Sequence, residues 1–189
     1  MPRYVTATLA FLCSLWTSVT GASPADTVVK VVPGYVHGCA LTAQGAVYCW
    51  GMEWVNGRAE NTSIAHRVEG LPKAVALASG HVNTCILDGD GMAWCWGVDL
   101  QASVLAKRAV LTGPKPVAGL LPAAMIASGY LHTCAVIRQD GSVRCWGANA
   151  AGEIGDGSTT DRAEPARAGD ITRATSISAS PRCMRWLSF

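Results

Sequence analysis

The chain has 189 residues, half of them hydrophobic, and only 15% are charged, well below the roughly 25% typical of soluble domains. A formal net charge of +2 is too small to indicate a nucleic-acid or acidic-lipid partner. The length is enough for one ordinary core or for three to four repeat units. Few charged residues together with 20 glycines favour short strands and tight turns over surface helices.

The first 22 residues have the features of a secretory signal. Arg3 supplies a positive charge, an uncharged apolar stretch runs from Tyr4 to Val19, and small residues follow. We therefore expect residues 1–22 to be a signal peptide, with cleavage after Ala22 or Ala25. A membrane anchor is the alternative, but about 16 apolar residues are fewer than the roughly 20 that span a bilayer. The rest of the sequence contains no comparable segment, so we expect a secreted, periplasmic or cell-surface protein.

A short pattern then occurs three times in the expected mature domain, residues 23–189. Its cores are residues 34–51, 80–97 and 129–147, and each core begins with glycine, has a cysteine five residues later and ends in Cys-Trp-Gly. The first cysteines of successive copies are separated by 46 and then 49 residues, and a period of this size indicates repeat architecture. An incomplete fourth copy begins at residue 174.

Each repeat core predicts a β-hairpin. An apolar, β-branched run from Val28 to Val32 predicts a strand ahead of the first core. Within that core, His37–Leu41 and Ala46–Trp50 read as two strands joined by a tight turn, and the second and third cores have Asp-Gly in the corresponding turn. The two cysteines of the third core are 11 residues apart rather than 10, so its hairpin holds one more turn residue or a bulge.

Stretches of about 30 residues link each Cys-Trp-Gly to the next repeat. Each ends in an apolar, strand-like run, Ala74–Gly80 and then Ala123–Gly129, and a third run, Ala174–Ser180, opens the fourth unit. Every unit therefore offers three short strands with room for a fourth, which is the content of a β-propeller blade. A helix over Ala106–Leu111 is the alternative, but the prolines that follow disfavour it, and we predict an all-β chain.

The cysteines fall into regular pairs. Cys13 lies in the signal segment, and Cys183 is left over. The remaining six form the pairs Cys39/Cys49, Cys85/Cys95 and Cys134/Cys145. In an oxidising compartment such pairs are most simply disulfides, since opposed residues of a hairpin are close enough to be bridged. Zinc, bound by thiolates with His37 or His132, is the alternative, but Asn83 replaces the histidine in the second copy and there is no Cys-x-x-Cys.

The repeated Gly-x-x-His-x-Cys-Ala-Leu…Gly-x-Val-x-Cys-Trp-Gly pattern resembles the regulator of chromosome condensation (RCC1) repeat. The third copy extends the match furthest, through Asn149, Gly152 and Ile154-Gly155, whereas the first two copies lack this extension. Cysteines in both strands resemble the extracytoplasmic, bacterial-type repeats. The resemblance implies a β-propeller of four-stranded blades, usually seven to a ring, of which this chain holds about three and a half.

A partial ring leaves apolar edges and an unpaired strand. We therefore expect either a piece of a longer propeller or a protein that self-associates. Self-association would use the open propeller edge or Cys183.

Candidate site residues have structural interpretations. His37 and His132 recur at one position of the repeat, which favours a hydrogen-bonding role at a strand end over catalysis. The recurring Trp50, Trp96 and Trp146 favour packing between blades over an aromatic binding surface for sugar or protein, to which Trp54 and Trp94 would add.

Two surface segments carry further sites. The oxygen-rich Gly155–Asp161 segment could suit calcium but lacks the EF-hand spacing, and the resemblance implies a blade loop. Asn61-Thr-Ser63 is a glycosylation sequon, which matters if the host glycosylates. The sequence contains no motif of a hydrolase or of a phosphate-binding loop, so we expect no catalytic residue, cofactor or metal.

These observations predict an extracytoplasmic, non-catalytic scaffold for protein–protein recognition, with a protein partner that the sequence does not identify. Contacts are expected from Met52–Glu69 and Val98–Val117, the stretches that depart most from the repeat. A hydrolase inhibitor, as related secreted propellers are, is one alternative. Guanine-nucleotide exchange, the activity of the family's nuclear member, is a second, and carbohydrate binding through the tryptophans is a third.

The cysteine pairing is directly testable. Peptide mapping by mass spectrometry without reduction should recover the three pairs within the repeat cores, and Cys183 either unpaired or joined to a second chain. Free thiols in the repeat cores, or Cys183 joined to one of the six within a monomer, would contradict the pairing.

Overall fold

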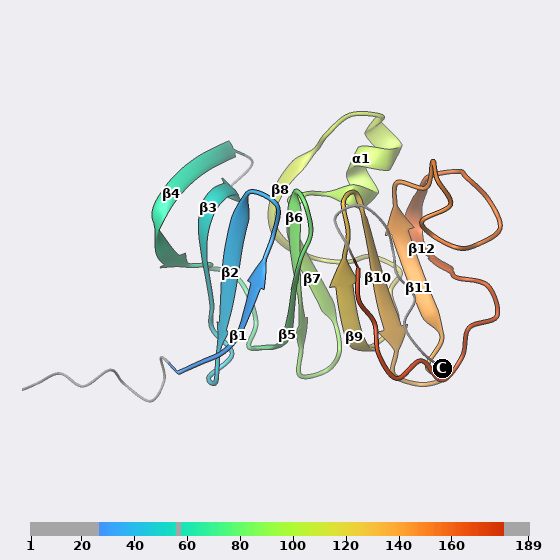
Figure 1. Cartoon of the computed structure of the whole chain (residues 1–189), viewed down its shortest axis with the longest axis horizontal. Coiled ribbons are helices and arrows are strands. Elements are labelled where there is room, and N and C mark those ends of the chain that lie inside the picture. The colour runs from blue at the N-terminus through green and yellow to red at the C-terminus, as the bar shows by residue number, and fades with distance from the viewer. Residues whose placement is uncertain (1–26, 56–57, 180–189) are drawn as a thin grey trace, which may run out of the picture.

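The computed structural model of the chain describes residues 27–55 and 58–179; the predicted signal peptide, Cys13 and Cys183 lie outside this part. The described residues form three four-stranded antiparallel sheets, each with its strands in chain order, and one short helix (Figure 1). We call the sheets the first, second and third blade. The first blade holds β1 (Val28–Pro33), β2 (His37–Thr42), β3 (Val47–Val55) and β4 (Arg58–Arg67). The second holds β5 (Ala74–Ser79), β6 (Asn83–Asp88), β7 (Ala93–Val98) and β8 (Leu111–Pro116). The third holds β9 (Ala123–Ser128), β10 (His132–Ile137), β11 (Val143–Gly147) and β12 (Arg162–Arg167).

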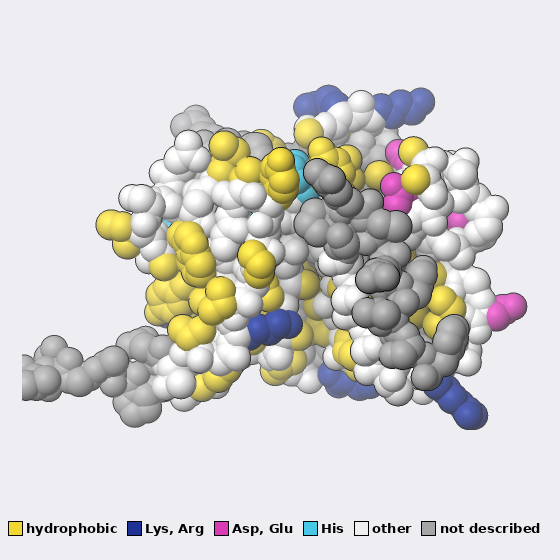
Figure 2. Space-filling view, in the orientation of Figure 1, with side chains coloured by type: hydrophobic (Ala, Val, Ile, Leu, Met, Phe, Trp, Pro, Cys, Tyr) yellow, Lys and Arg dark blue, Asp and Glu magenta, His cyan; other side chains and the backbone are white. Residues whose placement is uncertain are grey.

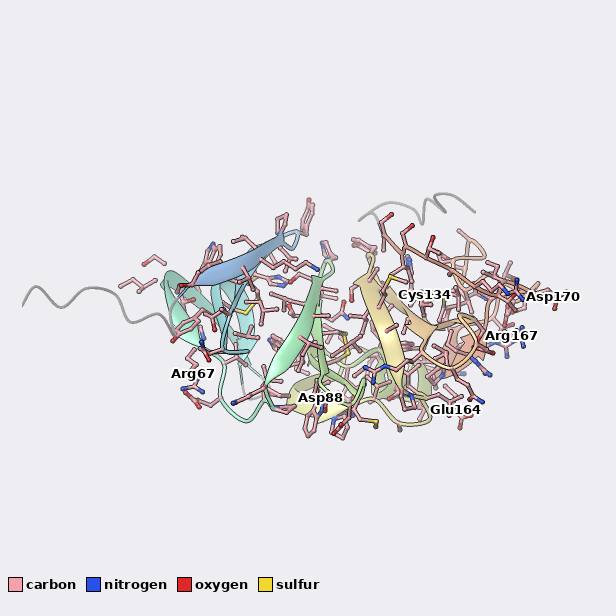
Figure 3. All side chains as sticks on the ribbon, turned by 90° about the horizontal axis from the view of Figure 1, so that it is seen from below. Arg67, Asp88, Cys134, Glu164, Arg167 and Asp170 are labelled. Carbon is pink, nitrogen blue, oxygen red and sulfur yellow. A yellow bond between two sulfur atoms is a disulfide. The ribbon has the colours of Figure 1, made fainter. Side chains whose placement is uncertain are left out.

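The three blades stand side by side and fan out from their first strands, as the view from below shows (Figure 3). In Figure 1 the turns that join the first and second strands of each blade lie at the top, and the hairpin turns of the repeat cores lie at the bottom. We call these sides the upper and lower faces. The predicted all-β fold with a fourth strand in each unit is confirmed.

The central hairpins have the predicted register. Cys39 lies opposite Cys49, and the other two cysteine pairs are opposed in the same way. The turn of the first hairpin is closed by a bond from the Thr42 amide to the Ala46 carbonyl, whereas the third joins Ile137 to Ser142, one residue further apart. The ladder between β10 and β11 has no register shift, so the extra residue lies in the turn and the bulge alternative is wrong.

In the structure a disulfide crosses each of these hairpins, as Figure 3 shows near Cys134. The two Cα atoms of each bridge are 4.1 Å apart, as opposed residues of an antiparallel ladder must be. In a chain-entropy account, a bridge that closes so small a loop stabilises the fold by about 2 to 3 kcal/mol. Each bridge also fills the centre of a blade with sulfur.

Neighbouring blades pack through residues at the same positions of the repeat. Leu77 and Trp96 of the second blade are buried in one cluster with the Cys39–Cys49 disulfide of the first. Ile126 and Trp146 of the third blade are buried in the same way with Cys85 of the second. The predicted packing role of these tryptophans is confirmed. Burying each such side chain contributes about 1.5 to 3 kcal/mol, so the blade interfaces hold the blades together.

A polar contact accompanies this packing at both interfaces. Nε2 of His37 is hydrogen-bonded to Oγ1 of Thr84 at 2.7 Å, and Nδ2 of Asn83 donates to Oγ1 of Thr133 at 3.1 Å. Histidine and asparagine thus perform the same task at one position of the repeat, which confirms the predicted hydrogen-bonding role for His37. Because Asn83 and both threonines are buried, the bonds also fix which residues face each other.

The run at 174–179 follows the third blade without forming a strand. Ala174 donates its amide to the Gly141 carbonyl at 3.0 Å, just as Ala74 does to Gly45, so the run begins at the position of a first strand. Ala174 and Ile177 pack against the third blade. In each complete blade the first strand pairs with the second strand of the same blade, and the described residues contain no such partner for this run. Within the described residues, the predicted fourth unit is thus represented by an extended segment that belongs to none of the three sheets.

One element was not predicted. α1 (Leu100–Ala106) lies between β7 and β8, before the Ala106–Leu111 stretch that we considered and rejected as a helix. Asp99 caps it, because its side chain accepts from the Ala102 amide at 3.1 Å. Lys107 ends the helix in the left-handed conformation, at φ 52°.

The ladder between the third and fourth strands of every blade is interrupted at one place. The register shifts between Cys49 and Gly51, and equivalent shifts follow Cys95 and Cys145. The tryptophan of Cys-Trp-Gly sits at this irregularity each time. A break of this kind bends a strand and re-aims a side chain, which suits a tryptophan that packs on the neighbouring blade.

The blade interfaces can be compared by truncation of their tryptophans. Trp146→Ala should lower the free energy of unfolding by about 3 to 5 kcal/mol, since the ring is buried between two blades. Trp50→Ala should cost clearly less, because this ring lies on the outer side of the first blade and is half-buried. Denaturant unfolding measures both, and equal losses would contradict the assignment of the tryptophans to blade interfaces.

Candidate functional site

The upper face gathers the segments that depart from the repeat. α1 rises above the second blade, the ends of β3 and β4 extend upward beyond Gly51, and the loop between β11 and β12 lies beside α1 (Figure 1). Parts of the two stretches that we expected to make contacts, 52–69 and 98–117, therefore share one side of the molecule. The lower face carries only short turns.

A groove of about 730 Å³ opens on this face, between α1 and the loop that follows β11. Its walls are largely apolar, and charged side chains stand at its rim. The lining includes Val98, Leu100, Val104, Leu131, Ala148 and Thr160. Lys107 borders it at the end of α1 and Asp161 borders it from the loop. The groove therefore offers apolar contact with opposite charges at its two sides.

The α1 wall is held in place by polar contacts that Asp99 makes. Its carboxylate caps the helix and pairs with Lys115 of β8. The Asp99 amide donates to the Val110 carbonyl at 2.7 Å, and Ser103 accepts from the Val110 amide at 3.0 Å. These bonds close the α1 segment into a loop with fixed ends, which pre-forms its side of the groove.

Asn149 holds the opposite wall and stands two residues after Trp-Gly, as Asp99 does. The side chain is fully buried, and its Nδ2 donates to the carbonyls of Ser158 and Thr160, each at 3.0 Å. Its Oδ1 accepts from the Ile154 amide at 2.8 Å. One buried amide thus satisfies three backbone groups of the loop, and the loop keeps its shape without regular secondary structure.

Asp156 makes the other organising contacts of this loop. Its carboxylate accepts from Ser158 Oγ at 2.7 Å and from Arg162 Nε at 2.6 Å. Hydrogen bonds from Ser158, helped by the Arg162 charge, lower the pKa of Asp156 to about 2. The carboxylate that could have suited calcium is thus engaged within the loop. Among the residues that the structure describes, no three His, Cys, Asp or Glu side chains gather into a metal-binding group.

A row of rings runs along the upper face beside the groove. Tyr35, His81 and Tyr130 occupy the same position of the three repeats, and their ring centroids are 4.3 and 4.2 Å apart. Both tyrosines are exposed, and burial lowers the pKa of His81. The turn that carries Tyr130 also carries Leu131 of the groove, so the two surfaces are continuous. Sequence reasoning missed this row, although the recurrence of Tyr, His and Tyr after each Ser-Gly or Pro-Gly is visible in the repeats.

Basic residues lie at the exposed end of α1. Lys107 and Arg108 follow the helix and are exposed, and Figure 2 shows Lys or Arg side chains at the top of the molecule. The same view shows acidic side chains nearby, and hydrophobic ones gathered over β1 and β2 at the left. The upper face is thus mixed in charge.

The remaining predicted site residues are distributed over the fold. Asn61 is exposed on β4. His37 and His132 belong to the blade interior, and burial is the main cause that lowers the pKa of each. Trp94 donates to Asp88 beside the lower turn at 3.2 Å, whereas Trp96 and Trp146 are buried. The side chain of Trp54 lies outside the described part. These tryptophans of the second and third blades do not come together as a sugar-binding platform.

The described residues contain no helix that is long and apolar enough to cross a membrane. Three sheets of four antiparallel strands, packed face to face in a fan, define the chain as a set of blades of a β-propeller. The family model of the regulator of chromosome condensation (RCC1) repeat matches residues 28–53 and 126–153. These two segments of the chain thus match the RCC1 repeat, and the blades around them have the fold of RCC1-like propeller blades.

Solved structures agree with this assignment. The chain is similar to Prp20p of Saccharomyces cerevisiae, with a TM-score of 0.67 and 20% identity over 81% of this chain and 42% of that one. In the structure of Kap60 bound to yeast RCC1 (Prp20), the TM-score is again 0.67, with 26% identity over 81% of this chain and 38% of that one. The ectodomain of the receptor kinase CR4 from Physcomitrella patens gives a TM-score of 0.51 and 20% identity, over 82% of this chain and 34% of that one. This chain therefore spans about two fifths or less of the length of these proteins, and no curated protein matches its sequence.

The role of Asp156 in the loop predicts a pH effect. Because the pKa of this carboxyl is lower in the folded protein than in the unfolded chain, its stabilising contribution is complete above about pH 4 and is lost as the pH falls towards 2. Asp156→Asn should therefore be less stable than the native protein at pH 7 and should show a weaker decline between pH 4 and 2. Thermal unfolding across this range measures the difference, and parallel curves would contradict it.

Proposed function

We propose that this protein is a non-catalytic recognition scaffold that binds a protein partner through its upper face. The observation that carries the proposal is the groove between α1 and the 148–161 loop. Both of its walls are fixed by buried polar contacts, of Asp99 on one side and Asn149 on the other. A surface that is ordered before binding loses little conformational entropy when a partner docks.

The chemistry of the groove favours a peptide segment over a small molecule. It is open along one side and lined by apolar side chains, with Lys107 on one rim and Asp161 on the other. A partner segment with an apolar side chain for the groove and an acidic residue towards Lys107 and Arg108 would complement it. The exposed Tyr35 and Tyr130 extend the contact surface, since tyrosine is frequent in protein interfaces.

An extracytoplasmic location is part of the proposal. It is supported by the apolar N-terminal segment and by three disulfides inside the repeats, since such bridges persist in oxidising compartments. Glycosylation of Asn61 fits the same location, because the side chain is exposed.

A nucleotide-exchange role, as the nuclear member of the RCC1 family has, is one alternative. Prp20p of Saccharomyces cerevisiae binds Gsp1p and histones. This chain matches less than half of Prp20p. We therefore propose protein binding for it, and nucleotide exchange is the second candidate function. Hydrolase inhibition by capping of an active site would use the same upper face. Carbohydrate binding has less support, because two of the tryptophans are buried between blades.

The proposal can be tested with two leucines on opposite faces. Leu105 on α1 is 76% exposed, and Leu121 in the lower turn before β9 is 49% exposed. The immobilised native protein should capture a specific protein from the extracellular fraction of its source. Leu105→Asp should lower the affinity for that captured protein about tenfold or more. Leu121→Asp is the matched control and should bind like the native protein.

The affinity of the captured pair is then measured directly by interferometry. Equal binding by Leu105→Asp and Leu121→Asp would overturn the upper-face assignment. Turnover of a hydrolase substrate by the purified protein would overturn the non-catalytic assignment, and glycan binding without protein capture would favour the carbohydrate alternative.

A further inference from the structure

The outer face of the first blade exposes positions that are buried in the other two blades. Val31 is 57% exposed, whereas its equivalents Leu77 and Ile126 are 0% and 8% exposed. Val28 is likewise exposed, although Ala74 and Ala123 at the same repeat position are buried. The covered equivalents pack on the disulfide hairpin of the preceding blade. On the first blade, therefore, the residues that would form a blade interface are exposed, and no blade of the described structure packs on them.

The polar contact on this face of the first blade differs from that of the other two blades. Gly38 stands where the second and third blades have Thr84 and Thr133, the partners of His37 and Asn83. A Cβ at residue 38 would lie 3.0 Å from Nε1 of Trp50. The indole N–H therefore lies close to where the other blades hold their threonine hydroxyl. Since indole nitrogen only donates, this face offers a hydrogen-bond donor where the other blades offer a hydroxyl.

The third blade carries the complementary features. Its Cys134–Cys145 disulfide, Val136 and Val143 form the same receiving surface that the first and second blades use. His132 stands at the position of His37, and among the described residues its Nε2 is buried without a hydrogen-bond partner. With its proton on Nδ1, this imidazole offers at Nε2 an acceptor for the Trp50 indole.

Residues 174–179, which we call the strap, cover part of this receiving surface. Ile177 is only half-buried where Leu77 and Ile126 are buried, and the strap pairs with no strand in the described structure. Arg173 at its entrance has φ 59°, an unfavourable conformation for a residue other than glycine. Neither Lys73 nor Pro122, its equivalents, has a positive φ. The apolar contact that the strap makes is therefore less complete than that of a first strand in a complete blade.

We infer that the outer face of the first blade docks on the third blade of a second copy of this chain, where β1 takes the place of the strap. Val28 and Val31 replace Ala174 and Ile177, and the Trp50 indole donates to His132. If each copy docks on the other, two identical contacts form around a two-fold axis. The described blades of two copies number six, a count within the four to eight of known propellers.

Sedimentation of the full-length protein over a range of concentrations tests this inference. The native protein should reach twice the monomer mass without larger species. Val31→Asp should raise the dissociation constant about tenfold or more, since it places a charge in an apolar contact. Val75→Asp is the matched control, because Val75 is 61% exposed on the first strand of the second blade, at a position that is exposed in every blade. This control should dimerise like the native protein.

A strap variant separates head-to-tail docking from other dimers. Ile177→Asp loosens the strap and should lower the dissociation constant several-fold, provided that its circular dichroism matches that of the native protein. A native protein that stays monomeric overturns the inference, and so does an equal effect of Val31→Asp and Val75→Asp. If Val31→Asp abolishes the dimer while folded Ile177→Asp leaves it unchanged, two first blades meet face to face, and the head-to-tail arrangement is wrong.

Discussion

Everything in this fold depends on how a blade sits on the disulfide hairpin before it. A four-stranded sheet of this size cannot bury its own apolar face, and its hairpin disulfide stabilises it only modestly. In the second and third blades, one leucine or isoleucine and one tryptophan pack on the disulfide at the centre of the preceding blade. The His37–Thr84 and Asn83–Thr133 contacts then fix the alignment. Stability is therefore a property of neighbouring pairs of blades.

The repeats made most of this arrangement predictable. The spacing of the cysteines places them opposite each other in a hairpin, and the observed register follows from that spacing alone. The recurrence of one tryptophan indicated packing, because a position that repeats with the fold serves the fold. The separation of 11 rather than 10 in the third hairpin predicted one more turn residue or a bulge, and the ladder of the structure decides for the turn.

The upper face was much less predictable, for a physical reason. α1 is seven residues long and depends on the Asp99 cap and on Val110, two contacts that become clear only when the chain is folded. The 148–161 loop is organised by a single buried asparagine whose partners are up to 11 residues away. Neither segment has a hydrophobic period that indicates its shape. The aromatic row was detectable in the repeats, but only the structure shows that three rings from different blades stack together.

The break in the ladder after each Cys-Trp has a consequence for how such proteins can change. Below this break, the third and fourth strands pair in the register of the blade core. Above it, their pairing register is shifted. The first blade continues as a long hairpin, the second as a capped helix and the third as an asparagine-centred loop. Insertions at this level need not shift any residue of a blade interface. This irregularity thus separates the blade contacts, which recur in the described blades, from segments that differ from blade to blade. A library of new loops would be built just above it.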